Sequence, residues 1–437
     1  MKRLIDKLLI KWKNQDNRKP LLIHGARQVG KTHSIMEFGA KHYASVAYFY
    51  FDNNPQLCSI FESGISSIKS LLVKLSAFVN QEILPESTLM VFDEIQACPA
   101  ALSSLKRFNE TAENYHIIAA GSFLGVALRK EGSTFPVGKV DELSMQPLNF
   151  QEYLMEFNPP LLTLIRECFD ENTTMPSGLH DQAIEHYLHY LVIGGMPEVV
   201  TEYIKTESFN IVKAKQLSIC NNYVSDMNKH TDTKTQALRN EAIYNTLPSQ
   251  LAKENRKFQY AKIQSGARAK DYELSLDWLQ KASVILRCNK INEGKEPISA
   301  YTDFTSFKIY MSDVGLLNAK SNNSHLSVLG RTMGASAMGA LTENYVAQQL
   351  HANGFELFYW ESNNKAELDF VVQLENKIIP VEAKSWESVR SQSLEFFRRK
   401  YSIDFAIRIS AKNFGFGNGI KNVPLYAVWC IDKGTWK

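Results

Sequence analysis

Apolar and polar residues recur with different periods along the chain. Residues 20–150 contain short apolar runs that alternate with helical patterns, and the runs cover residues 20–24, 45–51, 88–92 and 116–120. Short strands that alternate with helices are typical of βαβ units and of a parallel sheet. We therefore predict an α/β fold with a parallel sheet for the first third of the chain.

The rest of the chain has another order of elements. Helical periodicity dominates from about residue 150 to 255, with Gly194-Gly195-Met196-Pro197 as the clearest interruption. Two helical patterns (241–254 and 270–281), two β-rich runs (284–290 and 305–311) and a linker-like stretch rich in Ser, Asn and Gly (321–337) follow. A last helical pattern from residue 338 precedes β-rich runs at residues 356–360, 367–374, 377–383 and 402–409.

Residues 1–15 have Leu4, Ile5, Leu8, Leu9 and Trp12 at helical spacing. We predict an amphipathic helix that packs on the first domain, with a role at a membrane surface as the alternative. No apolar run reaches the length of about 18 residues that a membrane span requires, so no membrane insertion is expected. The six cysteines are scattered without C-x-x-C spacing, which favours reduced thiols in the cytoplasm. The net charge of +3 is too close to neutral to indicate whether the chain binds nucleic acid.

A glycine-rich motif follows the first apolar run. It fits G-x-x-x-x-G-K-[ST] and consists of Gly25, Ala26, Arg27, Gln28, Val29, Gly30, Lys31 and Thr32. A strand pattern precedes it and a helical pattern begins at Lys31, which is the setting that a phosphate-binding P-loop requires. Glycines let the backbone wrap a phosphate closely, and N–H groups of the helix N-terminus face the anion. We expect Lys31 to contact the β- and γ-phosphates and Thr32 to ligate Mg²⁺.

Polar residues follow two further apolar runs. Asp93 and Glu94 come directly after the run that ends at residue 92, and ligands of open α/β sheets bind at the carboxyl ends of strands. We expect Asp93 to hold Mg²⁺, directly or through water, and Glu94 to be the general base that polarises the attacking water. Ser122 is expected beside them to orient this water, although its spacing fits a plain turn equally well.

These elements resemble AAA-type ATPases, and specifically a group of bacterial ATPases that begin with such a domain. The resemblance covers the P-loop and residues 91–96, 118–125, 135–139 and 148–154. Residues 194–198 and 307–317 resemble the C-terminal region of unassigned function that this group carries. The resemblance implies ATP and Mg²⁺ as cofactors and an arginine finger, for which Arg129 is a candidate. It is also compatible with a homo-oligomer.

The middle of the chain is similar to a winged helix-turn-helix, with the runs at 284–290 and 305–311 as the wing. Lys262, Arg268 and Lys270 near its candidate recognition helix are suited to phosphate contacts, whereas Asp271, Glu273 and Asp277 on that helix would repel DNA. The sequence leaves open whether this region contacts DNA or packs against other parts of the protein.

Two carboxylates and a lysine gather on the last predicted hairpin. Glu382 and Lys384 project together because residues two apart in a strand point to one face, and the hairpin brings Asp369 close to Glu382. Such a group can bind Mg²⁺, with the Ala383 carbonyl as a further ligand, and can position a water for phosphodiester hydrolysis, with Lys384 orienting or helping to deprotonate that water.

The hairpin pattern resembles the PD-(D/E)xK fold of restriction-endonuclease-like enzymes, with Leu368 where the motif name has proline. That family adds a glutamate from the preceding helix, and Glu343 fits by position, so the resemblance implies Mg²⁺ at Glu343, Asp369 and Glu382. DNA or RNA is the implied partner, and basic residues for its backbone are Arg390, Arg398, Arg399 and Lys400. Such folds also persist as inactive binding modules. The aromatic residues Tyr359, Trp360 and Trp386 are predicted to belong to the core rather than to a base-stacking surface.

Four domains are therefore expected: a P-loop ATPase domain (1–155), a helical lid (156–230), a winged-helix-like domain (231–325) and a nuclease-like domain (326–437). The leading hypothesis is an ATPase whose nucleotide cycle controls the nuclease-like domain through motion of the lid. The rival is a nucleotide-dependent protein-interaction switch with a catalytically silent last domain. A small-molecule kinase is disfavoured because the Asp93-Glu94 pair suits water activation.

Overall fold

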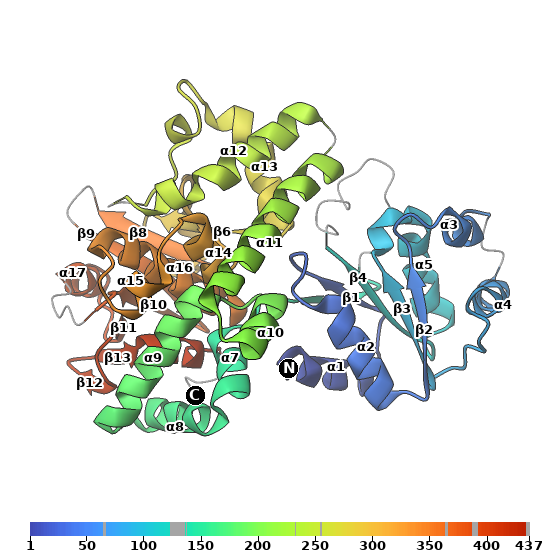
Figure 1. The fold of residues 1–437 in the computed structure, drawn as a ribbon, viewed down its shortest axis with the longest axis horizontal. Helices are drawn as coiled ribbons and strands as arrows, with labels where there is room; N and C mark the ends of the chain where they lie inside the picture. Colours follow the sequence, from blue (N-terminus) through green and yellow to red (C-terminus); the bar gives the residue numbers. More distant parts are fainter. Residues whose placement is uncertain are drawn as a thin grey trace. The chain divides into compact units, whose positions relative to one another are not determined.

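The computed structural model describes residues 1–63, 67–122, 136, 138–231, 233–253, 256–362, 366–386 and 392–433. Contacts divide the chain into two compact units, shown in Figure 1. The N-terminal unit comprises Met1–Gln146 with Lys281–Ser283, and the C-terminal unit comprises Pro147–Gln280 with Val284–Lys437. The predicted division into four domains stays a prediction.

The N-terminal unit contains a five-stranded sheet in the order β2-β3-β4-β1-β5, with every neighbouring pair parallel. Its elements are α1 (Ile5–Lys13), β1 (Leu21–His24), α2 (Lys31–His42), β2 (Ser45–Tyr50), α3 (Pro55–Glu62), α4 (Ile68–Val79), β3 (Thr88–Asp93), η1 (Ile95–Ala97), α5 (Pro99–Thr111), β4 (His116–Gly121) and β5 (Asp141–Ser144). The four strands predicted from the apolar runs are therefore present, and the α/β class with a parallel sheet is confirmed for this unit.

Helices cover both faces of this sheet. On one face, alternate strand residues such as Phe49 and Phe92 form a core with α3, α4 and α5. On the other face lies α2, where Gly39 is packed so closely that a Cβ would come within 2.6 Å of the Val46 side chain. Because both faces are buried, the strands are almost continuously apolar, as parallel strands typically are. Polar residues such as Asp93 therefore lie at the ends of the strands.

Helix α1 is amphipathic, as the spacing of its apolar residues predicts. Its residues Leu9 and Trp12 are buried, and the Trp12 Nε1 donates a hydrogen bond to the Lys19 carbonyl at 2.8 Å. The helix also contacts α2. The apolar face of α1 therefore packs within the N-terminal unit, and this favours the packing prediction over the membrane-surface alternative.

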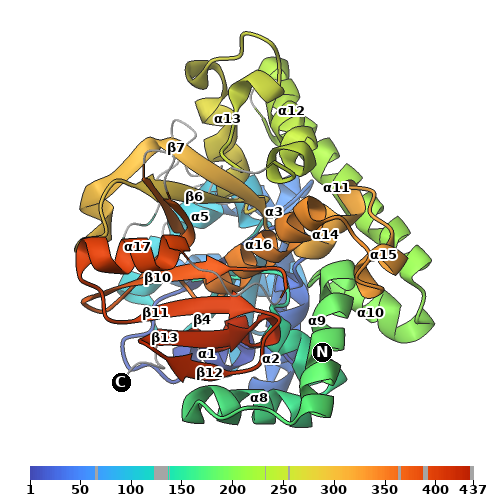
Figure 2. The same cartoon turned by 90° about the vertical axis from the view of Figure 1, so that its left-hand side faces the viewer.

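The C-terminal unit contains an eight-stranded mixed sheet in the order β12-β13-β11-β10-β9-β8-β6-β7. Figure 2 shows β10, β11, β13 and β12 side by side. Its strands are β6 (Ile285–Ile291), β7 (Thr302–Met311), β8 (Phe358–Ser362), β9 (Ala366–Leu374), β10 (Lys377–Ala383), β11 (Ala406–Ser410), β12 (Gly415–Gly417) and β13 (Ile420–Pro424). Its helices are α7 (Phe150–Phe157), α8 (Pro159–Glu171), α9 (Ser177–Ile193), α10 (Pro197–Thr206), α11 (Phe209–His230), α12 (Lys234–Leu251), η2 (Tyr260–Lys262), α13 (Ala269–Lys281), η3 (Ile298–Tyr301), α14 (Val314–Lys320), α15 (His325–Leu329), α16 (Ala335–Ala352), α17 (Gln392–Tyr401) and η4 (Leu425–Cys430).

The two strands expected to form a wing are antiparallel neighbours, but they do not stand apart. β6 also pairs in parallel with β8, so the hairpin β6–β7 ends the eight-stranded sheet. The pairing with β8 uses Asn289, Lys290 and Ile291, which are buried or half-buried, so this end of β6 is part of the sheet and not a solvated wing. The stretch expected as a linker likewise holds α15 and the start of α16.

A buried aspartate joins the interruption at Gly194-Gly195 to the segment after β7. Asp313 is fully buried and accepts hydrogen bonds from the backbone N–H groups of Gly195 at 2.6 Å and Leu316 at 2.9 Å. Gly194 has φ of 73°, and a Cβ there would lie 2.3 Å from the Asp313 carboxylate. The glycine pair therefore permits the close approach that this carboxylate needs.

Among the described residues, no helix has the length and hydropathy needed to cross a membrane.

The pH dependence of stability tests the burial of the Asp313 carboxyl between Gly195 and the segment after β7. Burial raises the pKa of the Asp313 carboxyl to about 6, while the backbone hydrogen bonds lower it. The Asp313 carboxyl therefore binds its proton more strongly in the folded than in the unfolded protein. Its contribution to the free energy of unfolding is present at low pH and is lost as the pH rises through about 6. At 1.36 kcal/mol per pKa unit, the loss is about 3 kcal/mol relative to Asp313→Asn, which does not titrate. Denaturant unfolding of both proteins between about pH 4 and about pH 7 checks this, and a pH-independent difference in unfolding free energy would contradict it.

Candidate functional site

The P-loop lies between β1 and α2, at the carboxyl end of the parallel strands. Gly25 has φ of 146°, Gln28 of 66° and Gly30 of 92°. A Cβ on Gly25 would lie 2.1 Å from the Met145 carbonyl oxygen, so this position requires glycine. From the start of the chain, the Arg3 guanidinium donates a hydrogen bond to the Val29 carbonyl at 2.9 Å. The loop is thus fixed by its own backbone and by Arg3.

Lys31 is buried in this loop. Its Nζ donates hydrogen bonds to the carbonyls of Gly25 (3.0 Å) and Ala26 (2.8 Å) and to the Ser122 Oγ (3.0 Å). Burial lowers the pKa of Lys31 to about 8, against the opposing effect of Glu94 and Asp93. An ammonium group with little solvent around it gains most from an anionic partner, as a polyphosphate would be.

Asp93 ends β3 and faces the P-loop helix. Its Oδ2 accepts hydrogen bonds from the Thr32 Oγ1 and from the Tyr48 hydroxyl, each at 2.8 Å. Its Oδ1 accepts the backbone N–H of Glu94 at 3.0 Å. A threonine hydroxyl beside a carboxylate is a set of hard oxygen donors that suits Mg²⁺. The residues expected to hold the metal are therefore adjacent.

Glu94 follows with a backbone φ of 51°, which is uncommon for a residue other than glycine. The Gln96 Nε2 donates a hydrogen bond to the Glu94 carboxylate, and the Ser122 Oγ lies 3.5 Å from Glu94 Oε1. Ser122 thus lies between Lys31 and Glu94, as the sequence predicts. Strained backbone at such a position is typical of functional residues.

Three residues of this site were not expected from the sequence. Tyr48 and Gln96 orient the two carboxylates, and Arg3 supports the P-loop. The sequence held a signal for Tyr48, because its hydroxyl group lies near the end of β2, and β2 is the neighbour of the strand that ends at Asp93. The arginine-finger candidate Arg129 lies outside the described residues.

The second group of predicted site residues lies on the hairpin β9–β10. Asp369 Oδ2 accepts the backbone N–H of Ala383 at 2.9 Å, and the Lys384 Nζ lies 2.9 Å from Glu382 Oε1. The other carboxylate oxygen of Glu382 is buried without a hydrogen-bond partner. The hairpin therefore brings Asp369, Glu382 and Lys384 to one strand end.

Glu343, on α16, belongs to a buried network of ion pairs. Its carboxylate pairs with Arg256, lies 3.1 Å from the Lys308 Nζ and accepts a 2.5 Å hydrogen bond from the Tyr310 hydroxyl. Lys308 also pairs with Glu367 at 2.7 Å. In the part of the chain that the structure describes, no three His, Cys, Asp or Glu side chains are grouped to hold a metal. The Mg²⁺ role of Glu343, Asp369 and Glu382 therefore stays a prediction.

The basic residues proposed for phosphate contact in the middle of the chain, Lys262, Arg268 and Lys270, are exposed near the start of α13. Two of the acidic residues beside them have partners, because Asp271 lies 3.7 Å from Arg239 and Glu273 lies 2.9 Å from Arg287. These pairs lower the repulsion that the helix would exert on DNA. Arg390 lies outside the described residues.

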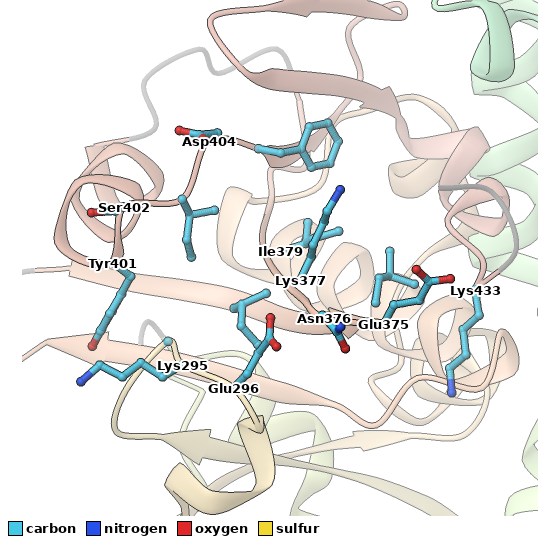
Figure 3. A pocket seen from close by; sticks show the side chains of 15 residues that line it. Lys295, Glu296, Glu375, Asn376, Lys377, Ile379, Tyr401, Ser402, Asp404 and Lys433 are labelled. Atoms are coloured by element: carbon cyan, nitrogen blue, oxygen red, sulfur yellow. The ribbon is translucent and has the colours of Figure 1, made fainter. Parts of the chain in front are cut away.

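A cavity of about 620 Å³ lies at the turn end of the hairpin β9–β10 (Figure 3). Asp369 and Lys384 are not among its lining residues. Its charged lining is mixed and comprises Lys295, Lys377, Lys433, Glu296, Glu375 and Asp404. Figure 3 shows the Lys295, Lys377 and Lys433 side chains pointing in different directions. The three lysines therefore do not converge on one point of the cavity.

Three segments of the chain match known protein families. Residues 17–154 match a family described as an AAA domain. Residues 184–327 and 338–428 match two families described as domains of unknown function, DUF8612 and DUF4143. No curated protein matches the chain.

Solved structures show only distant similarity. The Walker-type ATPase PABY2304 of Pyrococcus abyssi is 14% identical, with 73% of this chain and 95% of that chain covered and a TM-score of 0.43. The ADP form of the Aeropyrum pernix ORC2 protein is 12% identical, with 76% and 93% covered and a TM-score of 0.31. PCH-2 of C. elegans is 12% identical, with 47% and 61% covered and a TM-score of 0.27. At these TM-scores the similarity supports no conclusion.

The family match and the described geometry agree for the first segment. The parallel sheet, the P-loop between β1 and α2, and Asp93-Glu94 at the end of β3 are the parts that a P-loop nucleoside triphosphatase needs. Residues 17–154 are therefore a P-loop ATPase domain of the AAA type.

Proposed function

We propose that the chain binds ATP with Mg²⁺ and hydrolyses it, and that this cycle controls the C-terminal nuclease-like region. The observation that carries the proposal is the convergence of Lys31, Thr32, Asp93, Glu94 and Ser122 at one edge of the parallel sheet. These side chains come from α2, β3 and the end of β4, and each has the chemistry that one step of ATP hydrolysis requires.

Each residue of the site has a distinct role in this proposal. The P-loop backbone and Lys31 bind the β- and γ-phosphates, and Lys31 exchanges its carbonyl partners for phosphate oxygens. Thr32 and Asp93 hold the Mg²⁺, which would supply charge neutralisation on the phosphates. Glu94 accepts a proton from the attacking water, and Ser122 with Gln96 keeps the Glu94 carboxylate oriented.

For the C-terminal region, we propose phosphodiester hydrolysis at Asp369, Glu382 and Lys384. The buried Glu382 oxygen without a partner supports a cation site there, since an unpaired buried carboxylate oxygen is costly. Lys384, whose side chain is 33% exposed, is accessible to a water and a phosphate. DNA or RNA would be the substrate.

One observation favours the alternative, a nucleotide-dependent interaction switch with a silent nuclease-like region. Glu343 is neutralised by Arg256 and Lys308, so two protein cations already satisfy the carboxylate that would complete a metal site. In this alternative the ATPase site keeps its role, and Lys384 has none in catalysis.

Replacing Lys31 by alanine tests nucleotide binding. The variant removes the ammonium group that pairs with the phosphates, so ATP affinity should fall by about 100-fold or more. Titration with a fluorescent ATP analogue measures this. Lys41→Ala, at the exposed end of the same helix, serves as the control and should bind like the wild type. Unchanged affinity in Lys31→Ala would rule out the P-loop assignment.

Replacing Glu94 by glutamine separates binding from hydrolysis. Glutamine keeps the size of the side chain but cannot accept the proton, so turnover should fall by about 10²- to 10⁴-fold while ATP affinity stays within a few fold of wild type. Phosphate release at saturating ATP measures turnover. Wild-type turnover in this variant would remove Glu94 from the base role.

Replacing Lys384 by alanine tests the nuclease-like site. Linear, circular and single-stranded DNA and RNA are incubated with Mg²⁺ or Mn²⁺, with and without ATP. We expect cleavage that is lost in Lys384→Ala and retained in Lys377→Ala, which changes the exposed first residue of the same strand. ATPase activity without cleavage of any substrate would instead favour the interaction switch.

A further inference from the structure

Trp386 follows the candidate nuclease motif and differs from the other described tryptophans. Trp12, Trp278, Trp360 and Trp429 are all buried, with at most 5% of their surface exposed. Trp386 is only partly buried, so the prediction that places it in the core is wrong. Tyr359 and Trp360, by contrast, are core residues as predicted.

An arginine from another segment lies over this indole ring. The guanidinium carbon of Arg331 lies 5.3 Å from the centre of the Trp386 ring, within the range of a cation–π contact. Arg331 is exposed and has a backbone φ of 57°, a conformation that is costly for arginine. Its N–H donates a hydrogen bond to the Val328 carbonyl at 3.2 Å, which helps to hold the turn after α15.

The pair is close to the proposed catalytic lysine. Trp386 is two residues after Lys384, so their Cα atoms are at most about 7 Å apart in extended chain. Lys384 is itself partly exposed. Trp386, with the Arg331 guanidinium over its ring, therefore lies next to Lys384 in the chain, on the segment that leaves β10.

We propose that Arg331 and Trp386 bind a single strand of nucleic acid and lead it to the site at Asp369, Glu382 and Lys384, an inference that rests on the proposed function. Arg331 binds a backbone phosphate and fixes one side of the indole, and an unpaired base stacks on the exposed part of Trp386. Stacking of bases on aromatic side chains next to cations is how single strands are bound without sequence preference. A duplex fits less well because its bases are stacked on one another.

Tryptophan fluorescence of the parent, compared with that of Trp386→Phe, measures this contact, because the other described tryptophans are buried. Trp436 lies outside the described residues, so it is replaced by phenylalanine in all proteins used. The probes are a 12-nucleotide oligothymidylate, the matching oligouridylate, an abasic strand of equal length and a duplex, all in EDTA to prevent cleavage. We expect both single strands to quench the fluorescence, and the abasic strand and the duplex to quench it little. The single strand that quenches more strongly shows whether DNA or RNA is the preferred ligand.

Affinity of the same strands is then measured in variants by fluorescence anisotropy. Trp386→Ala should bind about tenfold more weakly and Trp386→Phe nearly as well as the parent. Arg331→Ala should bind more weakly and lower the slope of log affinity against log salt by about 0.7. Phe416→Ala, which removes an aromatic residue that is 59% exposed elsewhere on the sheet, is the control and should bind unchanged.

The outcomes separate this inference from the proposed function. Absence of binding, equal affinity of Trp386→Ala and the parent, or equal quenching by the duplex and the abasic strand would each overturn the inference. If cleavage with Mg²⁺ or Mn²⁺ is lost in Lys384→Ala, the proposed nuclease nevertheless stands. Quenching that depends on Trp386, without cleavage by the wild type, would keep the strand-binding site and refute the nuclease.

Discussion

The hydrogen bond between Thr32 and Asp93 is the contact on which the nucleotide site depends. It joins the first turn of α2 to the end of β3, two strand positions away from β1 in the sheet. The parallel arrangement makes this possible, because the carboxyl ends of β1, β3 and β4 meet at one edge. The same edge therefore holds the P-loop, both carboxylates and Ser122, while the apolar faces are buried under helices.

The C-terminal unit uses its polar residues differently. Its mixed sheet buries charged side chains, and Lys308 and Glu343 are almost fully enclosed. A buried charge is tolerated only with a partner, so these residues form pairs with Arg256 and Glu367. Asp369, Glu382 and Lys384 lie at the end of the hairpin, where one carboxylate oxygen is left without a partner. The Glu382 oxygen motivates the proposed site, and the ion pairs of Glu343 motivate its silent alternative.

The sequence predicted the features that local chemistry dictates. The P-loop, the strand before it and the Asp93-Glu94 pair could be found because spacing alone defines them, and the structure places Lys31, Thr32 and Asp93 together. Contacts between distant segments could not be found this way. Nothing local indicates that β6 pairs with β8, that Arg256 reaches Glu343, or that Arg331 covers Trp386. Gln96 could not be found because its role exists only relative to Glu94, whereas the position of Tyr48 near a strand end was a signal that could have been used.

A double-mutant cycle on Thr32 and Asp93 tests the central claim most directly. ATP affinity is measured with and without Mg²⁺ for the wild type, Thr32→Val, Asp93→Asn and the double variant. If both residues hold the same ion, each single change removes most of the Mg²⁺-dependent affinity and the double change removes little more. Losses that add, or that are equal with and without Mg²⁺, would contradict a shared metal site and with it the proposed ATPase mechanism.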